Sequence, residues 1–177
     1  MNIDPKNRGF TLIELIVSVS LLAITIAFAA PSFVAVIQNN RSVNLTNDLI
    51  GSLNMARSEA IKRGLSVSVC AASNQNFNSC GNNWNQGWIV FVNPDENNTF
   101  ANNATEPIVR LQQIHTQSAD ISLSPTGIIT YTSNGFAAST SANKRFSISS
   151  HNCTGNNARR ITISPTGRAI LTQTACP

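Results

Sequence analysis

Residues Arg8–Phe33 read RGFTLIELIVSVSLLAITIAFAAPSF, an apolar run that is long enough to cross a bilayer. The run carries one acid, Glu14, near its start and one proline, Pro31, near its end. A carboxylate at the centre of a membrane span costs about 2.5–3.5 kcal/mol, so Glu14 calls for a partner. Proline lacks a backbone N–H and clashes with the preceding turn, so Pro31 is expected to kink a helix.

Three interpretations of this stretch differ in where the chain is cut. An ordinary secretory signal would be cut near Ala29, but Glu14 would then be an acid inside the apolar region of the signal. A plain membrane anchor supplies no partner for Glu14. A cut between Gly9 and Phe10 leaves Phe10 with a free amino group, and Glu14 of a neighbouring subunit can pair with that group in a helical assembly. The third interpretation explains the acid as a device for subunit registration.

The same stretch closely resembles the N-terminus of type IV pilins and type II secretion pseudopilins. The resemblance rests on Gly-Phe-Thr-Leu-Ile-Glu-Leu (residues 9–15) followed by an apolar span. It implies that an inner-membrane prepilin peptidase removes residues 1–9, cuts after Gly9 and methylates the new N-terminal Phe10. It also implies that Glu14 serves assembly and that Pro31 lies where the helix bends or melts in filaments.

Two further segments resemble the GspH/FimT group of minor pilins and pseudopilins. MARSEAIKRGLSVSVC (Met55–Cys70) looks like the end of the long helix and the first strand of that group. WNQGWIVFVNPDENN (Trp84–Asn98) is similar to a strand that precedes a polar loop in the same group. The resemblance covers most of the chain, more loosely after residue 100, and implies a minor subunit whose mechanism is assembly rather than catalysis.

The chain keeps a helical pattern beyond the apolar run, up to Arg63. Apolar residues recur three and four positions apart and form one stripe, Leu45, Leu49, Leu53, Ala56 and Ala60. Lys62, Arg63 and Gly64 are typical of a helix C-terminus. With the resemblance, this predicts an α+β protein of the type IV pilin fold, in which a long N-terminal helix, membrane-spanning in its first half, packs on an antiparallel β-sheet head. The predicted parts are a leader (1–9), the membrane or filament-core half of the helix (10–38) and a periplasmic head (39–177).

The pattern after Gly64 is that of short strands. Residues 65–70 alternate between apolar and polar side chains and predict a half-buried strand. Gly87–Val92 is a continuous apolar run and predicts a buried strand, with Trp88 in the core. Further short strands are expected at residues 108–111 and 145–149.

Two segments share Ser-Pro-Thr-Gly between β-branched runs. They are ISLSPTGIIT (Ile121–Thr130) and ITISPTGRAI (Ile161–Ile170). Proline at the second turn position and glycine at the fourth fit a type I turn closed by a left-handed glycine. Both segments are therefore predicted to form hairpins of the same construction.

The four cysteines are expected to form disulfides. An even number beyond an N-terminal membrane segment is typical of an oxidising compartment. Three pairings are possible, and we favour Cys70–Cys80 with Cys153–Cys176, because each closes a local loop. A metal role is less favoured, since no two cysteines have the short spacing of a zinc site.

No catalytic constellation is evident, so the chain is predicted not to be an enzyme and to have no cofactor or metal. His115 and His151 are isolated in sequence and lie in no motif with a nucleophile. Asp95 and Glu96 could offer oxygen ligands to calcium, but their spacing is not diagnostic, and a solvated loop is favoured.

Positive charge gathers in the C-terminal third, where no acid follows Asp120 but five cations do: Lys144, Arg145, Arg159, Arg160 and Arg168. Such a region can meet a polyanion such as DNA. The resemblance points the same way, because FimT-like minor pilins bind DNA through a C-terminal Gly-Arg-x-Arg motif. Here Gly167 and Arg168 match that motif, but Ile170 replaces its second arginine.

The predicted function is that of a minor pilin or pseudopilin that assembles into, or primes, a type IV pilus or a type II secretion pseudopilus. Its expected partners are other minor and major pilins or pseudopilins, prepilin peptidase and the inner membrane, with DNA as a further candidate. Before assembly it is expected to be a single-pass inner-membrane protein with a periplasmic head. The alternatives are a DNA-binding minor pilin for natural transformation and a secreted soluble β protein with an ordinary signal peptide.

Overall fold

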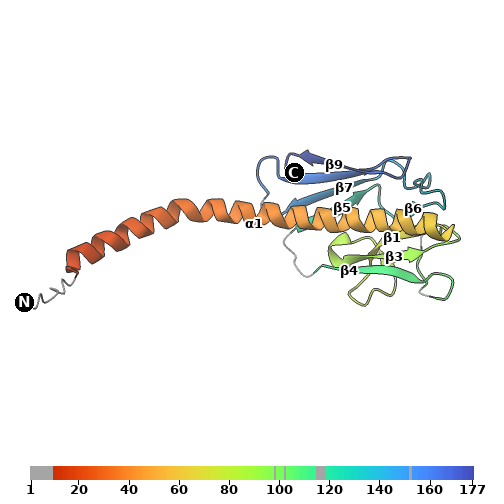
Figure 1. Ribbon diagram of the computed structural model, residues 1–177, viewed down its shortest axis with the longest axis horizontal. Coiled ribbons are helices and arrows are strands. Elements are labelled where there is room, and N and C mark those ends of the chain that lie inside the picture. Colours follow the sequence, from red (N-terminus) through yellow and green to blue (C-terminus); the bar gives the residue numbers. More distant parts are fainter. Residues whose placement is uncertain (1–9, 98, 102, 115–118, 152) are drawn as a thin grey trace, which may run out of the picture. The chain divides into compact units, whose positions relative to one another are not determined.

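The computed structural model describes residues 10–97, 99–101, 103–114, 119–151 and 153–177 (Figure 1). The chain divides into two compact units, residues 1–37 and residues 38–177. We call the second unit the head. The helix α1 (Leu12–Arg63) begins in the first unit and ends in the head.

The C-terminus of α1 has the features that its sequence predicts. Lys62 and Arg63 lie in the last turn, where positive charge interacts favourably with the helix dipole. Gly64 follows with a φ of +66°, and its N–H donates to the carbonyl of Ala60 at 3.0 Å. A glycine in this left-handed conformation ends the helix without a steric penalty.

The head contains two antiparallel sheets. The first sheet has the order β2-β1-β3-β4, and β6 also pairs with β1. Its strands are β1 (Val67–Ala72), β2 (Cys80–Gly81), β3 (Gly87–Val92), β4 (Ile108–Gln113) and β6 (Ile129–Tyr131). A short 3-10 helix, η1 (Trp84–Gln86), precedes β3.

The second sheet is a regular antiparallel array with the order β5-β7-β8-β9. Its strands are β5 (Ala119–Ser124), β7 (Arg145–Ser150), β8 (Ala158–Ile163) and β9 (Ala169–Thr174). Within the head, the C-terminal part of α1 lies along both sheets (Figure 1).

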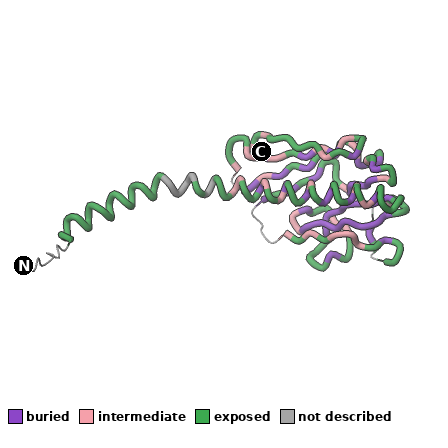
Figure 2. The backbone as a smooth tube through the Cα atoms, viewed as in Figure 1, coloured by how far each residue is buried: buried purple, intermediate pink, exposed green. Residues whose placement is uncertain are grey.

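The main core lies between α1 and the two sheets (Figure 2). Four residues of the predicted stripe are fully buried there, Leu49, Leu53, Ala56 and Ala60, and Leu45 packs against the same cluster. Trp88 is fully buried, as predicted, and the rings of Trp84 and Phe146 meet edge to face at 4.7 Å. The described residues of this core all belong to the head.

The strand expected at residues 65–70 differs from the prediction. β1 begins only at Val67, and Leu65 is 44% exposed. All six residues of β1 are buried, because a second apolar cluster, which includes Cys70 and Ala72, covers the face opposite α1. The polar residue Ser68 is tolerated there because its hydroxyl lies 2.8 Å from the Thr130 hydroxyl and accepts from the Asn93 amide.

Only one of the two predicted hairpins exists. The second Ser-Pro-Thr-Gly segment joins β8 to β9, and the Gly167 N–H donates to the Ser164 carbonyl at 2.9 Å. The first segment does not form a hairpin, because β5 pairs with β7 and β6 pairs with β1 of the other sheet. This copy is therefore a crossover between sheets, although its turn sequence is the same.

Two disulfides link segments that are close in sequence. Cys70 of β1 bonds to Cys80 of β2, and Cys153 bonds to Cys176, with 5.6 Å between the Cα atoms in each pair. These are the two local pairs that the sequence favoured. The second bond ties the loop after β7 to the segment that follows β9.

Gly167 is expected to be a sensitive position of the head. Its φ is +78°, and a Cβ at this position would overlap the carbonyl oxygen of Gly135. We expect Gly167→Ala to lower the free energy of unfolding by about 2–5 kcal/mol, through backbone strain and the steric overlap. Gly155→Ala is the matched control, because Gly155 has a φ of +66° but open space around its Cα. Its cost should be about 1–2 kcal/mol in the same urea titration, and equal costs would contradict the packing argument.

Candidate functional site

The first unit exposes an apolar surface. The exposed large apolar side chains of this unit are Phe10, Leu12, Ile13, Leu15, Ile16, Val17, Val19, Leu21, Leu22, Ile24, Ile26, Phe28, Phe33, Val36 and Ile37 (Figure 2). Extensive exposed apolar surface of this kind marks a site of interaction with protein or membrane. Within the part of the chain that the structure describes, no helix combines the length and apolarity needed to cross a membrane.

Glu14 lies in the first turn of α1 and is exposed. Its backbone N–H donates to the Thr11 hydroxyl at 3.3 Å, and the residues form the Thr-x-x-Glu pattern of a helix N-terminus. An acid at this position is stabilised by the helix dipole. Glu14 therefore suits the start of the helix for a local reason that the sequence reasoning overlooked, and among residues 10–97 it has no ion-pair partner.

The other predicted residues of the first unit are only partly described. Gly9 lies outside the described residues, and Phe10 is 82% exposed. α1 continues through Pro31, so the subunit by itself has helical backbone where the sequence predicted a bend or melting in filaments. The roles of Gly9, Phe10, Glu14 and Pro31 remain predictions.

Lys144 was predicted as a surface cation for DNA, and the structure contradicts this. The residue is only 6% exposed, and its Nζ donates to the carbonyls of Thr126 and Ile128 at 3.1 and 3.0 Å. Burial lowers the pKa of the Lys144 ammonium below its ordinary value of 10.5. Lys144 thus holds the crossover between β5 and β6 in place and is not available to a phosphate.

Arg159 is also partly used within the head. It lies on the core side of β8, since it pairs with Ile148 of β7, and its guanidinium donates to the Asn39 side chain of α1 at 3.0 Å. The predicted patch of five cations therefore loses one member completely and a second in part.

The other three arginines share one face of the second sheet. Arg145 pairs with Thr162, and Arg160 pairs with Ser147 and Thr172, so the side chains of Arg145 and Arg160 project from the same side. Arg168 follows on that side, because its carbonyl accepts from the Ser164 N–H, two residues beyond Thr162. We call this surface, defined by exposed Arg145, Arg160 and Arg168, the arginine face.

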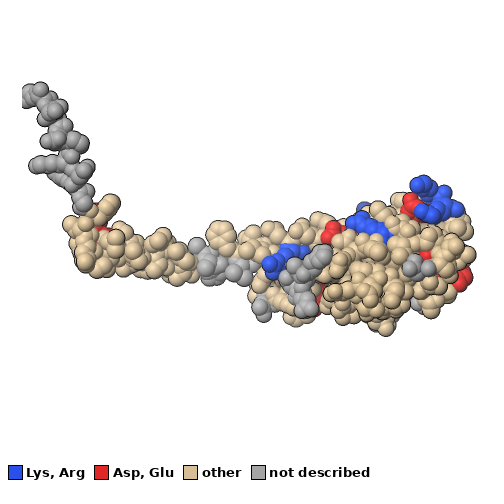
Figure 3. Space-filling model, turned by 90° about the horizontal axis from the view of Figure 1, so that it is seen from below, with Lys and Arg blue, Asp and Glu red and all other residues tan. Residues whose placement is uncertain are grey.

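Charge is sparse elsewhere on the surface. Figure 3 shows one side of the molecule, on which Lys and Arg form small separate groups within a mainly uncharged surface. Two of the cations, Lys62 and Arg63, are paired with Glu59, whose pKa is lowered chiefly by its hydrogen bond to Arg63.

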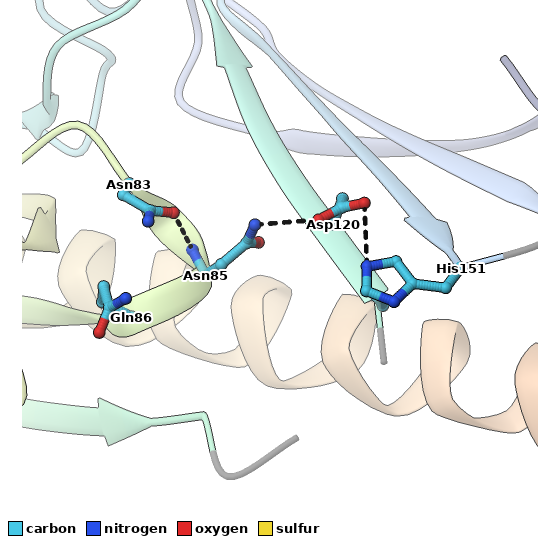
Figure 4. Close-up of a pocket in the computed structure, with 6 residues that line it drawn as sticks. Asn83, Asn85, Gln86, Asp120 and His151 are labelled. Atoms are coloured by element: carbon cyan, nitrogen blue, oxygen red, sulfur yellow. Dashed lines mark hydrogen bonds and ion pairs between the residues drawn. The ribbon is translucent and has the colours of Figure 1, made fainter. Parts of the chain in front are cut away.

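His151 looked isolated in the sequence, but in the structure it has a side-chain partner. Its Nε2 lies 3.2 Å from Asp120 Oδ2, and the Asn85 amide donates to Asp120 Oδ1 at 3.1 Å (Figure 4). These side chains line a cavity of about 210 Å³ together with Asn83, Gln86 and Ala119. The Asn85 side chain also accepts from the Ile121 N–H at 2.7 Å, so the cluster ties η1 to β5. Sequence could not reveal it, because its members come from three separated segments.

The other residues weighed for chemistry have structural partners. Asp95 accepts from the Asn97 amide at 2.6 Å, and Glu96 accepts from the Ser66 hydroxyl at 2.6 Å. His115 lies outside the described residues. Among the residues that the structure describes, no three His, Cys, Asp or Glu side chains gather in a way that could hold a metal ion.

Comparison with protein families gives two matches. The family model described as type II transport protein GspH matches residues 45–167, which is more than half of the chain. The chain belongs to the GspH family. A second model, the prokaryotic N-terminal methylation motif, matches residues 4–30 of this family member. No curated protein matches the chain.

Two solved structures resemble this GspH-family protein, both of the type IV minor pilin FimU from Pseudomonas aeruginosa. One crystal form has 20% identity and a TM-score of 0.58, over 75% of this chain and 89% of FimU. The other has 22% identity and a TM-score of 0.53, over 71% and 88%. The likeness confirms the predicted fold, a long N-terminal helix packed on antiparallel sheets. The family and the N-terminal methylation motif make this protein a minor pilin or pseudopilin, with a role in a type IV pilus or pseudopilus.

Lys144 is expected to contribute to stability. Lys144→Met leaves the carbonyls of Thr126 and Ile128 without their donor, which should cost about 1–3 kcal/mol of unfolding free energy. Lys62→Met is the control, because the Lys62 side chain is 77% exposed, and it should change stability by about 0.5 kcal/mol or less.

The difference in unfolding free energy between the wild type and Lys144→Met should depend on pH. Because burial lowers the Lys144 pKa, the corresponding gain in stability is fully present above pH 10.5 and is lost as pH falls through the lowered pKa. The stability of the wild type relative to Lys144→Met should therefore rise with pH toward 10.5 in urea titrations. A difference that shrinks with rising pH would contradict the assignment.

Proposed function

We propose that this chain is a minor subunit that joins, or primes the assembly of, a type IV pilus or a type II secretion pseudopilus through residues 10–38. The observation that carries the proposal is the exposed apolar surface of the first unit, which lies within a matched N-terminal methylation motif. The buried core of the head is built from residues of the second unit, so the first unit has its own, separate apolar surface. Other pilins or pseudopilins would cover it in the filament.

The subunit would reach the filament by way of the inner membrane. Prepilin peptidase would remove residues 1–9 by cutting after Gly9, and Phe10 would be methylated. Residues 10–38 would then lie in the membrane as a single span until assembly, with the head in the periplasm. The two disulfides support this location, since such bonds persist in oxidising compartments.

Glu14 would set the register of assembly. The exposed Glu14 carboxylate would pair with the Phe10 amino group of a neighbouring subunit, and a subunit without this pair would leave a charge in apolar surroundings at a cost of about 2.5–3.5 kcal/mol. Pro31 would be the point at which α1 loses its regular hydrogen bonds when neighbours pack around it, because proline donates none there.

Replacement of Glu14 tests this function. Glu14→Ala should reduce the amount of the subunit in purified filaments about tenfold or more, because the interaction with the neighbouring amine is lost. Glu59→Ala, which removes an exposed acid near the other end of the same helix, should assemble normally.

Mass spectrometry of the mature N-terminus accompanies this experiment. Both variants should begin with a methylated Phe10. Normal incorporation of a correctly processed Glu14→Ala variant would contradict the register mechanism, and an N-terminus near Ala30 would indicate a secreted soluble protein instead.

A second candidate function is DNA binding by the head, as in a minor pilin for natural transformation. The observation that favours it is the arginine face, where three exposed guanidinium groups share one side of a sheet. Guanidinium groups bind phosphates through paired N–H donors, and such contacts give affinity without sequence preference. The replacement of the motif's second arginine by Ile170 leaves Arg145 and Arg160 as the additional contacts.

A gel-shift titration of the full chain in detergent, repeated at several salt concentrations, tests this second candidate. Replacing Arg145, Arg160 and Arg168 together by Gln should weaken binding and reduce the slope of log affinity against log salt by about 2–3, since each phosphate contact contributes about 0.9. The control replaces Lys62 and Arg63 by Gln and should leave the slope unchanged. Equal slopes for the wild type and the triple variant would exclude the arginine face as the DNA site.

A further inference from the structure

Besides the arginine face, the head has a second surface that could bind a partner, the edge of β9. β9 is the last strand of the second sheet, and among the described strands it pairs only with β8 (Figure 1). Its six residues pair regularly with Ala158–Ile163, without a register shift. The strand thus pairs with β8 without a bulge, and its other side is an edge of the sheet.

The pairing phase tells which backbone groups face that free side. In an antiparallel pair, residues that exchange hydrogen bonds with the partner alternate with residues whose N–H and C=O point away. The Ser164 N–H donates to the Arg168 carbonyl at 2.9 Å, which assigns Ile170 and Thr172 to the side that bonds β8. The N–H and C=O groups of Ala169, Leu171 and Gln173 consequently point away from the sheet.

β9 lacks the features that protect edge strands. Natural proteins block such edges with charged residues, proline, bulges or a covering segment. β9 reads Ala-Ile-Leu-Thr-Gln-Thr, has no charge or proline, and leaves Ile170 and Leu171 43% and 45% exposed. By contrast, the edge strand β5 is covered, because the Asn85 side chain accepts from the Ile121 N–H, and β4 carries Arg110 and pairs through a register shift.

The surrounding charge indicates the kind of partner. Arg168 precedes β9, and Arg160 lies beside Thr172 on the arginine face, while no acidic residue follows Asp120 in the chain. A second copy of β9 would bring more arginines and no carboxylate to this edge. An extended segment with Asp or Glu side chains would add a strand and neutralise both cations.

We infer that the free edge of β9 docks an extended acidic segment of another filament subunit as an additional strand of the second sheet. The inference rests on the proposed function, because the partner is another subunit of the same filament. Backbone hydrogen bonds to Leu171 and Gln173 bind the segment, and Arg160 and Arg168 select its charge.

Photo-crosslinking in cells that assemble the filament tests this inference. p-Benzoylphenylalanine is placed at position 171 of the full chain or, as a matched control, at position 65, where the natural leucine is equally exposed at 44%. Position 171 should crosslink to an extended segment of another pilin-like subunit that contains Asp or Glu, as identified by mass spectrometry, and position 65 should not. A crosslink to a second copy of this chain, to DNA, or to nothing in filaments that contain the subunit overturns the inference.

Substitutions give an independent measurement. Leu171→Pro removes only the outward N–H of residue 171 and keeps every hydrogen bond to β8. The docked segment then loses one backbone hydrogen bond, so the level of the subunit in filaments should fall about tenfold. Leu171→Val keeps the N–H and should assemble normally. If Leu171→Pro fails to fold, the replacement of both Arg160 and Arg168 by Glu tests the inference instead. This replacement should abolish the crosslink from position 171. A persistent crosslink overturns the inference.

Failure of the proposed function has a different signature. In that case the wild-type subunit is absent from filaments or lacks the methylated Phe10, and the inference fails with it. If the subunit is processed and present in filaments but the edge of β9 forms no crosslink, only the inference about β9 fails.

Discussion

The burial of one apolar stripe of α1 organises the whole head. Leu49 and Leu53 are fully buried between the helix and the sheets, and each such side chain contributes about 1.5–3 kcal/mol through its removal from water. Ala56 and Ala60 extend the stripe with small side chains that are also fully buried. Each sheet needs the helix to cover one of its faces, so neither sheet is an independent unit.

The same helix has opposite properties in its first part, and this contrast explains the division of labour in the molecule. From residue 38 onward, α1 has one apolar side and the head covers it. Before that point the large apolar side chains that the structure describes, from Phe10 to Phe28 and at Phe33, Val36 and Ile37, are exposed. Such a surface is stabilised only when another molecule or a membrane covers it and removes it from water. Assembly is therefore a consequence of the same hydrophobic effect that folds the head.

The chain has few charged residues, and this makes the exposed ones distinctive. Charged residues make up only 11% of the chain, and one of the C-terminal cations, Lys144, is consumed in holding a crossover between sheets. The remaining exposed arginines then stand out because no carboxylate lies near them in sequence. Both proposals for the second sheet use this property, one through the arginine face and the other through the neighbouring edge of β9.

The sequence alone determined the features that depend on local chemistry. The stripe from Leu45 to Ala60, the helix end at Gly64 and the buried strand with Trp88 follow from periodicity and capping. For the disulfides the sequence left three pairings open and favoured the two local ones, which are those that the structure contains. The pilin-like N-terminus was equally evident, because its motif lies in one contiguous stretch. These features need no knowledge of distant contacts.

Only the tertiary structure decided how distant segments meet. Two identical Ser-Pro-Thr-Gly sequences form a hairpin in one case and a crossover in the other, because the packing of whole sheets determines which strands pair. Lys144 in the C-terminal third is buried, and His151, in the turn after β7, lies beside Asp120 of β5. Burial and pairing across the fold are set by the sum of many weak contacts, and no single stretch of the sequence carries that sum.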